Sequence, residues 1–133
     1  MRVLVDTNVI ISAILFPKSL PSDVIKELAI NHDIILCTHI IEELQEIFDR
    51  KFPNKKQMIE EFLSELTYEL IYTPSIINKD KYPFIRDDKD LPILVSAING
   101  MCDVIITGDK DFLEMEIDNP KIMTARLFME TVN

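Results

Sequence analysis

The chain has 133 residues, a length that predicts one domain over residues 1–133 with a core that needs no disulfide or metal to hold it. A content of 47% hydrophobic and 28% charged residues excludes a disordered chain, and the longest aliphatic run is far too short to span a bilayer. The net charge of −9 excludes a broad basic face for nucleic acid, although it leaves open a nucleic-acid site built on bound cations.

Short aliphatic runs alternate with longer amphipathic ones along the chain. The predicted strands cover residues 1–6, 33–37, 70–73, 103–107 and 121–125. The predicted helices cover residues 8–16, 21–31, 38–50, 55–69, 91–100 and 111–116, and a last helix follows residue 125. All-aliphatic strands that alternate with helices are typical of a parallel sheet covered on both faces. We therefore expect a three-layer α/β/α fold with a central, mainly parallel sheet.

Asp6 directly follows the aliphatic residues of the first predicted strand. In such folds the ligand crevice lies at the carboxyl ends of the strands, near the point where the strand order reverses. Asp6 is therefore expected where the fold would place its chemistry.

A glutamate lies at the border of the apolar face of the helix predicted over 38–50. Ile40 and Leu44 lie on that face, and Glu43 falls roughly 100° from its centre, whereas Glu42 falls roughly 160° away. Glu43 can therefore aim into a crevice, and a solvated helix flank is the alternative.

Asp90 stands at the start of the helix predicted over 91–100, because Pro92 is suited to the first helical turn. An aspartate there commonly caps the helix. Asp87 or Asp88 could serve as the cap instead, which would leave Asp90 free.

Asp109 and Asp111 follow the strand predicted over 103–107, after a turn at Gly108. The alternative to a functional role is a turn plus a helix cap, with Asp111 as the favoured cap.

Taken together, these acids are expected to meet at one edge of the sheet. The set consists of Asp6, Glu43, Asp90 and Asp109, with Asp111 beside them. Carboxylates so close repel one another, and some would bind protons at neutral pH unless a cation joins them. Oxygen ligands suit Mg²⁺ or Mn²⁺, and two such ions about 4 Å apart would suit a phosphodiester displacement. Two ions would also offset four of the nine excess negative charges.

Four stretches of the chain, in this order, resemble the motifs of PIN-domain nucleases, and VapC-like toxins of toxin–antitoxin pairs resemble the chain most in length and motif order. The stretches are VLVDTNVIISA, Thr38–Leu44, Asp90–Ala97 and IITGDKDFL. The resemblance runs over essentially the whole chain.

The resemblance implies a metal-dependent endoribonuclease that hydrolyses RNA, in which Mg²⁺ or Mn²⁺ is held by the acids named above. By the same resemblance, Asn8 would orient a metal-bound water and Thr107 would lie near the metals. It also implies an antitoxin partner, with a basic residue in the acidic crevice, and a homodimer. Ser12, one helical turn beyond Asn8, could contact RNA, although a serine there more often packs.

Three other functions are weighed against the nuclease. A receiver-like signalling domain needs an acid pair after the first strand and a lysine after the last, whereas Lys121 opens the last predicted strand. A phosphatase of the haloacid dehalogenase kind needs an acid at position 8, which is Asn8. A catalytically silent PIN-like scaffold or RNA-binding module would not need the complete set of acids.

Cys37 and Cys102 match no metal-binding spacing and are expected to be buried thiols in a cytoplasmic protein. No signal peptide is expected, because three apolar residues separate Arg2 from Asp6.

A local group of cations could form a phosphate-binding rim or could simply favour a helix end. It consists of Arg50, Lys51, Lys55 and Lys56. The apolar residues of the next predicted helix could serve the core or a dimer, namely Ile59, Phe62, Leu63 and Leu66.

Overall fold

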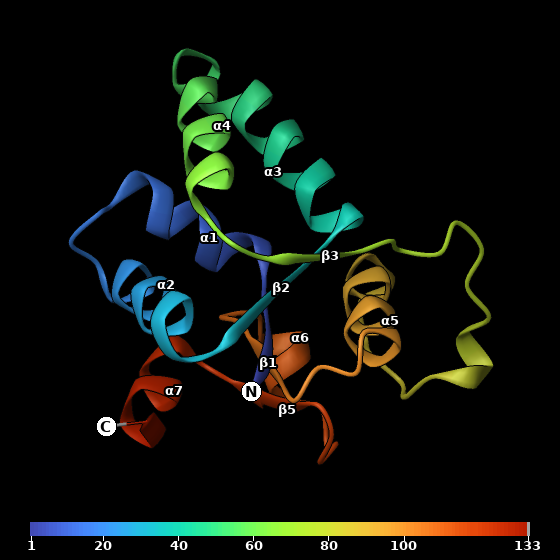
Figure 1. Ribbon diagram of the computed structural model, residues 1–133. Helices are drawn as coiled ribbons and strands as arrows, with labels where there is room; N and C mark the ends of the chain where they lie inside the picture. The colour runs from blue at the N-terminus through green and yellow to red at the C-terminus, as the bar shows by residue number, and fades with distance from the viewer. Residues whose placement is uncertain (133) are drawn as a thin grey trace.

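The computed structural model describes residues 1–132, which are built around a five-stranded sheet in the order β3-β2-β1-β4-β5 (Figure 1). The strands are β1 (Arg2–Val5), β2 (Asp33–Cys37), β3 (Glu69–Ile71), β4 (Val104–Ile106) and β5 (Lys121–Met123). Every pairing is parallel, so the expected mainly parallel sheet is confirmed and is parallel throughout. β4 is buried throughout and β1 is buried except at Arg2, as expected for strands covered on both faces.

Helices cover both faces of the sheet and confirm the three-layer α/β/α fold. The α-helices are α1 (Thr7–Leu15), α2 (Leu20–Asn31), α3 (Thr38–Lys51), α4 (Lys56–Glu65), α5 (Leu91–Asn99), α6 (Lys110–Leu113) and α7 (Ala125–Val132). Short 3₁₀ turns are η1 (Pro53–Lys55), η2 (Lys79–Lys81) and η3 (Asp88–Asp90). In Figure 1, α2 and α7 lie to the left of the sheet and α5 lies to the right.

Local sequence signals explain where most of these helices begin and end. Ser19 caps α2, since its hydroxyl accepts a hydrogen bond from the Ser22 amide, and Pro21 occupies the first turn. The helix predicted over 55–69 is too long: α4 ends at Glu65 because Leu66 is already extended. The chain then needs an extended segment to pair β3 with β2. The other predicted elements are present within a few residues.

The chain reverses its direction across the sheet beside β1. From β1 it moves outward to β2 and β3, and it then returns to β4 on the other side of β1. The Asp6 amide donates to the Ile106 carbonyl over 2.9 Å, which ties the ends of β1 and β4 together. Their carboxyl ends therefore form the kind of switch point where α/β folds bind ligands.

The core is a continuous aliphatic and aromatic cluster on both faces of the sheet. Cys37 and Cys102 are buried free thiols within it, as expected. Ile59 is buried, and its neighbours on α4 pack against the same cluster, so this helix face serves the core.

No single helix in residues 1–132 is both long and apolar enough for a membrane span. The pair of α1 and α2 meets that test of length and composition together, but the two helices are bent by 104° relative to each other.

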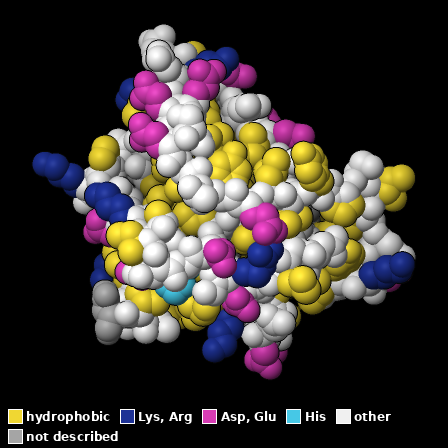
Figure 2. All heavy atoms as spheres, viewed as in Figure 1, with side chains coloured by type: hydrophobic (Ala, Val, Ile, Leu, Met, Phe, Trp, Pro, Cys, Tyr) yellow, Lys and Arg dark blue, Asp and Glu magenta, His cyan; other side chains and the backbone are white. Residues whose placement is uncertain are grey.

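The surface in Figure 2 shows where charge lies on one face of the molecule. Acidic side chains gather over α4 at the top of the view, and Lys and Arg side chains are scattered singly or in small groups. That face shows no broad basic area, in keeping with the acidic composition.

Candidate active site

Asp6 lies at the junction of β1 and α1, buried but for 5% of its surface. Its backbone is extended and its carboxylate caps α1, because Oδ1 accepts from the Thr7 amide over 2.7 Å. Oδ2 accepts from the Thr107 hydroxyl over 2.7 Å. Both carboxylate oxygens therefore have a neutral donor that fixes their position.

Thr107 connects Asp6 to the loop that carries the next acid. The Thr107 hydroxyl accepts from the Asp109 amide over 3.0 Å while it donates to Asp6. Asp109 Oδ1 in turn accepts from the Asp111 amide over 2.8 Å, so Asp109 caps α6. The expectation that Asp111 is the favoured cap is wrong, because Asp109 has the extended backbone of a cap and Asp111 already lies in the first turn.

Glu43 reaches the same edge of the sheet from α3. Its Oε1 accepts from the Thr7 hydroxyl over 2.8 Å, and His39 Nε2 lies 3.7 Å from the same oxygen. Its side chain is 32% exposed, whereas Glu42 is largely exposed to solvent. The helical phase thus predicted the orientations of both glutamates correctly.

Asp90 ends η3 and precedes α5, where Pro92 sits in the first turn as expected. Its carboxylate caps neither element, because Asp87 accepts from the Lys89 amide over 3.0 Å and caps η3. Among the residues that the structure describes, Asp90 Oδ2 is sealed from solvent with no hydrogen-bond partner. A buried carboxylate oxygen left in this state is costly without a cation or a proton.

Asp111 is also buried, but it has a cation of its own. Arg86 Nε donates to its Oδ1 over 2.6 Å, with the Arg86 side chain 76% exposed and that of Asp111 9% exposed. One carboxylate oxygen from each of Asp87, Asp90 and Asp111 lies within 4.8 Å of the others. Three acids therefore crowd around η3 and the start of α6.

The electrostatics of the site link Asp6 to Asp90. Burial raises the pKa of Asp6; bonds from Thr107 and Thr7 oppose the rise, and the charges of Glu43 and Asp109 add to it. Burial also raises the pKa of Asp90 to about 7, helped by the charge and close approach of Asp109 and by the charge of Asp6. The acids are therefore close enough to disfavour one another's ionisation.

The remaining predicted residues lie around this centre in different ways. Asn8 is exposed and Ser12 is half-buried on α1, and neither side chain makes a hydrogen bond within residues 1–132. Sequence reasoning missed two neighbours of the acids, namely Thr7 and Arg86, and it named Asp87 only as a possible cap. Thr7 could have been found beside Asp6 in the strand-end motif, whereas nothing local in the sequence joins Arg86 to Asp111.

The donor set fits a hard divalent cation. All the candidate ligands are carboxylate oxygens, which Mg²⁺ and Mn²⁺ prefer, and Asp90 Oδ2 is an orphaned oxygen that a cation would satisfy. The predicted set of Asp6, Glu43, Asp90 and Asp109 is not gathered this tightly, because the described acids whose ligand oxygens come within 4.8 Å of one another are Asp87, Asp90 and Asp111. Asp6 and Asp109 lie close enough to Asp90 for their charges to raise its pKa. Arg86 already neutralises Asp111, so this acid is the least available of those predicted.

Comparison with known proteins gives a family match and a structural match. The family model described as PIN domain matches residues 2–111. One chain of the crystal structure of VapBC2 from Rickettsia felis, bound to a DNA fragment from their promoter, is 22% identical and superposes with a TM-score of 0.69. That match covers 92% of the present chain and 97% of the other, and it shows a shared fold. No curated protein matches the chain significantly.

Proposed function

The chain belongs to the PIN-domain family, and from this premise we propose that it is a Mg²⁺- or Mn²⁺-dependent endoribonuclease that hydrolyses RNA phosphodiesters. The observation that carries the proposal is the orphaned Oδ2 of Asp90, held beside Asp109 and Asp6 at the switch point of the sheet. A receiver-like domain or a haloacid dehalogenase phosphatase does not agree with this family membership.

The chain's own residues prepare the site before substrate arrives. Thr107 and the Thr7 amide hold the two oxygens of Asp6, and the Thr7 hydroxyl holds Glu43. Asp90 and Asp109 add carboxylates that no neighbouring cation neutralises within residues 1–132. Mg²⁺ or Mn²⁺, when bound, would supply the Lewis acidity that activates water and stabilises charge on the phosphate. Fixed acids of this kind need little reorganisation when a cation and RNA bind.

Cleavage of single-stranded RNA tests the proposal, with and without Mn²⁺. We expect Asp6→Asn and Asp109→Asn each to lower the cleavage rate by at least about 100-fold, because each removes a fixed charge at the reacting centre. Glu43→Gln should also lower the rate, whereas Glu42→Gln, one residue away on the exposed side of α3, is the matched control. Full activity of Asp6→Asn or Asp109→Asn, or activity unchanged by EDTA, would contradict the proposal. A folded chain that binds RNA without cleaving it in Mn²⁺ would favour the silent scaffold.

We also propose that the chain is a toxin held by an antitoxin, acts in the cytoplasm and forms a homodimer. The structural match to VapBC2 supports the proposed toxin–antitoxin pair by analogy of fold. Exposed apolar side chains between β3 and α5 provide surface for a protein contact, since Tyr72, Ile76 and Phe84 are 78%, 89% and 85% exposed. Co-purification with the product of a neighbouring reading frame tests the antitoxin. A solution mass near 15.4 kDa instead of twice that value would contradict the dimer.

A further inference from the structure

A cleft lined by two cations and two acids adjoins the acidic site at Glu43. It has a volume of about 420 Å³ and lies between α3 on one side and η3 with the start of α5 on the other. Arg50 and Lys89 provide its cations, and Glu43 and Glu46 also line it. We call this feature the basic cleft.

The two cations of the basic cleft are free of ion pairs. Within residues 1–132, Arg2, Lys56, Lys79 and Arg86 each pair with a carboxylate, whereas neither Arg50 nor Lys89 does. Other cations of residues 1–132, among them Lys26 and Lys51, also lack such a pair, but Arg50 and Lys89 face one cleft beside Glu43. Unpaired cations beside a cleft suit an anionic ligand.

The structure also separates the cations that the sequence grouped as one local patch. Arg50 faces the basic cleft. Lys56 pairs with Asp49 and lines a different hollow, and Lys51 and Lys55 are exposed outside the cleft. Of the four residues, Arg50 is therefore the one placed to serve the acidic site.

We propose that the basic cleft holds the sugar–phosphate backbone of single-stranded RNA, with Arg50 and Lys89 contacting phosphates next to the bond that the acids cleave. The inference rests on the proposed ribonuclease function and assigns substrate positioning to these two residues. A cleft of this volume has room for a ligand of nucleotide size and is too small to enclose a duplex.

The negative charge of the acids explains why RNA binding would need cations beside the site. The acids repel phosphate until cations neutralise them, so the site itself gives little attraction to the rest of the RNA. Arg50 and Lys89 supply that attraction beside Glu43, while Glu46 opposes it with a negative charge on the same wall. The two cations and Glu46 should therefore change RNA affinity in opposite directions.

The test is the binding of a non-cleavable 2′-O-methyl RNA oligonucleotide to the full chain in Mg²⁺, followed by fluorescence anisotropy at several salt concentrations. We expect Arg50→Ala and Lys89→Ala each to weaken binding by about three- to tenfold. Each should also reduce the slope of log affinity against log salt by about 0.7, the value for one phosphate contact to a single strand. Glu46→Gln should instead strengthen binding.

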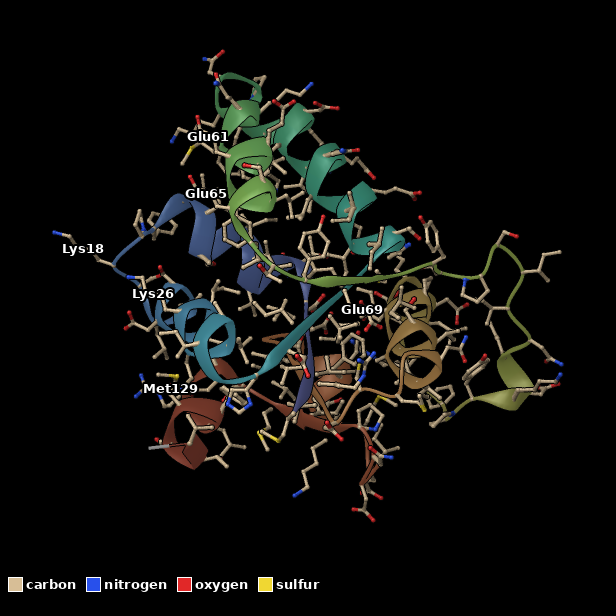
Figure 3. The ribbon with its side chains drawn as sticks, in the orientation of Figure 1. Lys18, Lys26, Glu61, Glu65, Glu69 and Met129 are labelled. Atoms are coloured by element: carbon tan, nitrogen blue, oxygen red, sulfur yellow. The ribbon has the colours of Figure 1, made fainter. Side chains whose placement is uncertain are left out.

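The control variants remove cations that lie outside the basic cleft. Lys51→Ala alters the residue next to Arg50 on α3, and Lys26→Ala alters α2, on the opposite side of the view from α5 (Figure 3). Both should leave affinity and salt slope unchanged within about twofold. In cleavage assays, Arg50→Ala and Lys89→Ala should raise KM with little change in kcat, because positioning is lost and the acids remain. Unfolding midpoints near that of the wild type verify that the variants fold.

Each outcome separates this inference from the proposed function. If the wild type binds and cleaves RNA while Arg50→Ala and Lys89→Ala behave as Lys51→Ala does, the cleft assignment is wrong and the ribonuclease proposal stands. If the wild type neither binds nor cleaves RNA, both proposals fail. If poly-glutamate binds through Arg50 and Lys89 while RNA does not, the cleft serves an acidic protein partner and the inference is overturned.

Discussion

The carboxylates at the switch point fall into two regions that the fold stabilises differently. At the ends of β1 and β4, Asp6 and Glu43 accept hydrogen bonds from Thr7 and Thr107. Around η3, Asp90 leaves one buried oxygen without a partner, and Asp111 is neutralised by Arg86. Neutral donors can hold a carboxylate in place without cancelling its charge, whereas the second region has a deficit of positive charge that a cation would fill. The first region therefore fixes the geometry of its acids, and the second leaves negative charge that no neighbouring group balances.

The largest effect is expected from Asp90→Asn, which removes the negative charge of the carboxylate whose Oδ2 has no partner. We expect the affinity for Mn²⁺ to fall by about 10- to 100-fold, a range typical of losing a group that supports a metal site. Isothermal titration calorimetry measures it. Asp88→Asn is the control on the same turn, because Asp88 is exposed and paired with Lys79. Equal Mn²⁺ affinities of Asp90→Asn and the wild type would show that the orphaned oxygen has nothing to do with metal.

Thr107→Val breaks the first region instead. It removes one donor to Asp6 and one acceptor for the Asp109 amide at a site only 1% exposed. We expect the free energy of unfolding to fall by about 1–3 kcal/mol, the cost of unsatisfied buried polar groups. Urea denaturation measures it, Thr107→Ser should recover most of the loss, and Thr67→Val, at an exposed threonine, is the control. A loss no larger than that of Thr67→Val would mean that Thr107 does not hold the site together.

The sequence predicted the first region better than the second. A strand that ends at Asp6 and the helical phase of Glu43 are local patterns, and the structure has both in the expected orientation. Pro92 in the first turn and Asp87 as the alternative cap also correctly left the Asp90 side chain free. Periodicity within one element carries enough information for such positions.

The remaining features depend on contacts between distant parts of the chain. The Arg86–Asp111 pair joins residues that no local pattern relates, and it decides which acid is already neutralised. Asp109 caps α6 because its own amide donates to the Thr107 hydroxyl, which fixes the backbone of Asp109. The end of α4 at Glu65 follows from the pairing of β3 with β2, which overrides the helical periodicity of the sequence.

The second region should also make stability depend on pH when metal is absent. The pKa of Asp90 is raised from 3.8 to about 7, so the folded state holds a proton between these values that the unfolded state has lost. Stability from this group is therefore complete below about pH 4 and is lost as the pH rises through 7. After allowance for solvent screening, we expect a loss of about 1–2 kcal/mol.

Urea unfolding in EDTA between pH 5 and about pH 8 measures this effect. Asp90→Asn should flatten the pH dependence, since asparagine has no proton to lose, and should be more stable than the wild type at the upper pH. A wild-type protein that gains stability over this range relative to Asp90→Asn would contradict the raised pKa.

The smallest expected effect comes from Arg86→Ala, which removes the resident cation of the second region. The affinity for Mn²⁺ should rise by about two- to fivefold, because the loss of the exposed Arg86 side chain restores one negative charge on the buried Asp111. Lys79→Ala, which breaks the exposed pair with Asp88, is the control. Weaker Mn²⁺ binding by Arg86→Ala would show that Arg86 assists metal binding by ordering Asp111.

Anomalous scattering from a crystal of the chain soaked in Mn²⁺ tests most directly whether the acids of the site bind a metal ion. We expect at least one Mn²⁺ peak in contact with the carboxylates of Asp90 and Asp109, at the distances of about 2.0–2.3 Å that such ions adopt. A well-ordered site with no peak, or a peak confined to surface acids away from Asp6, Asp90 and Asp109, would contradict this expectation.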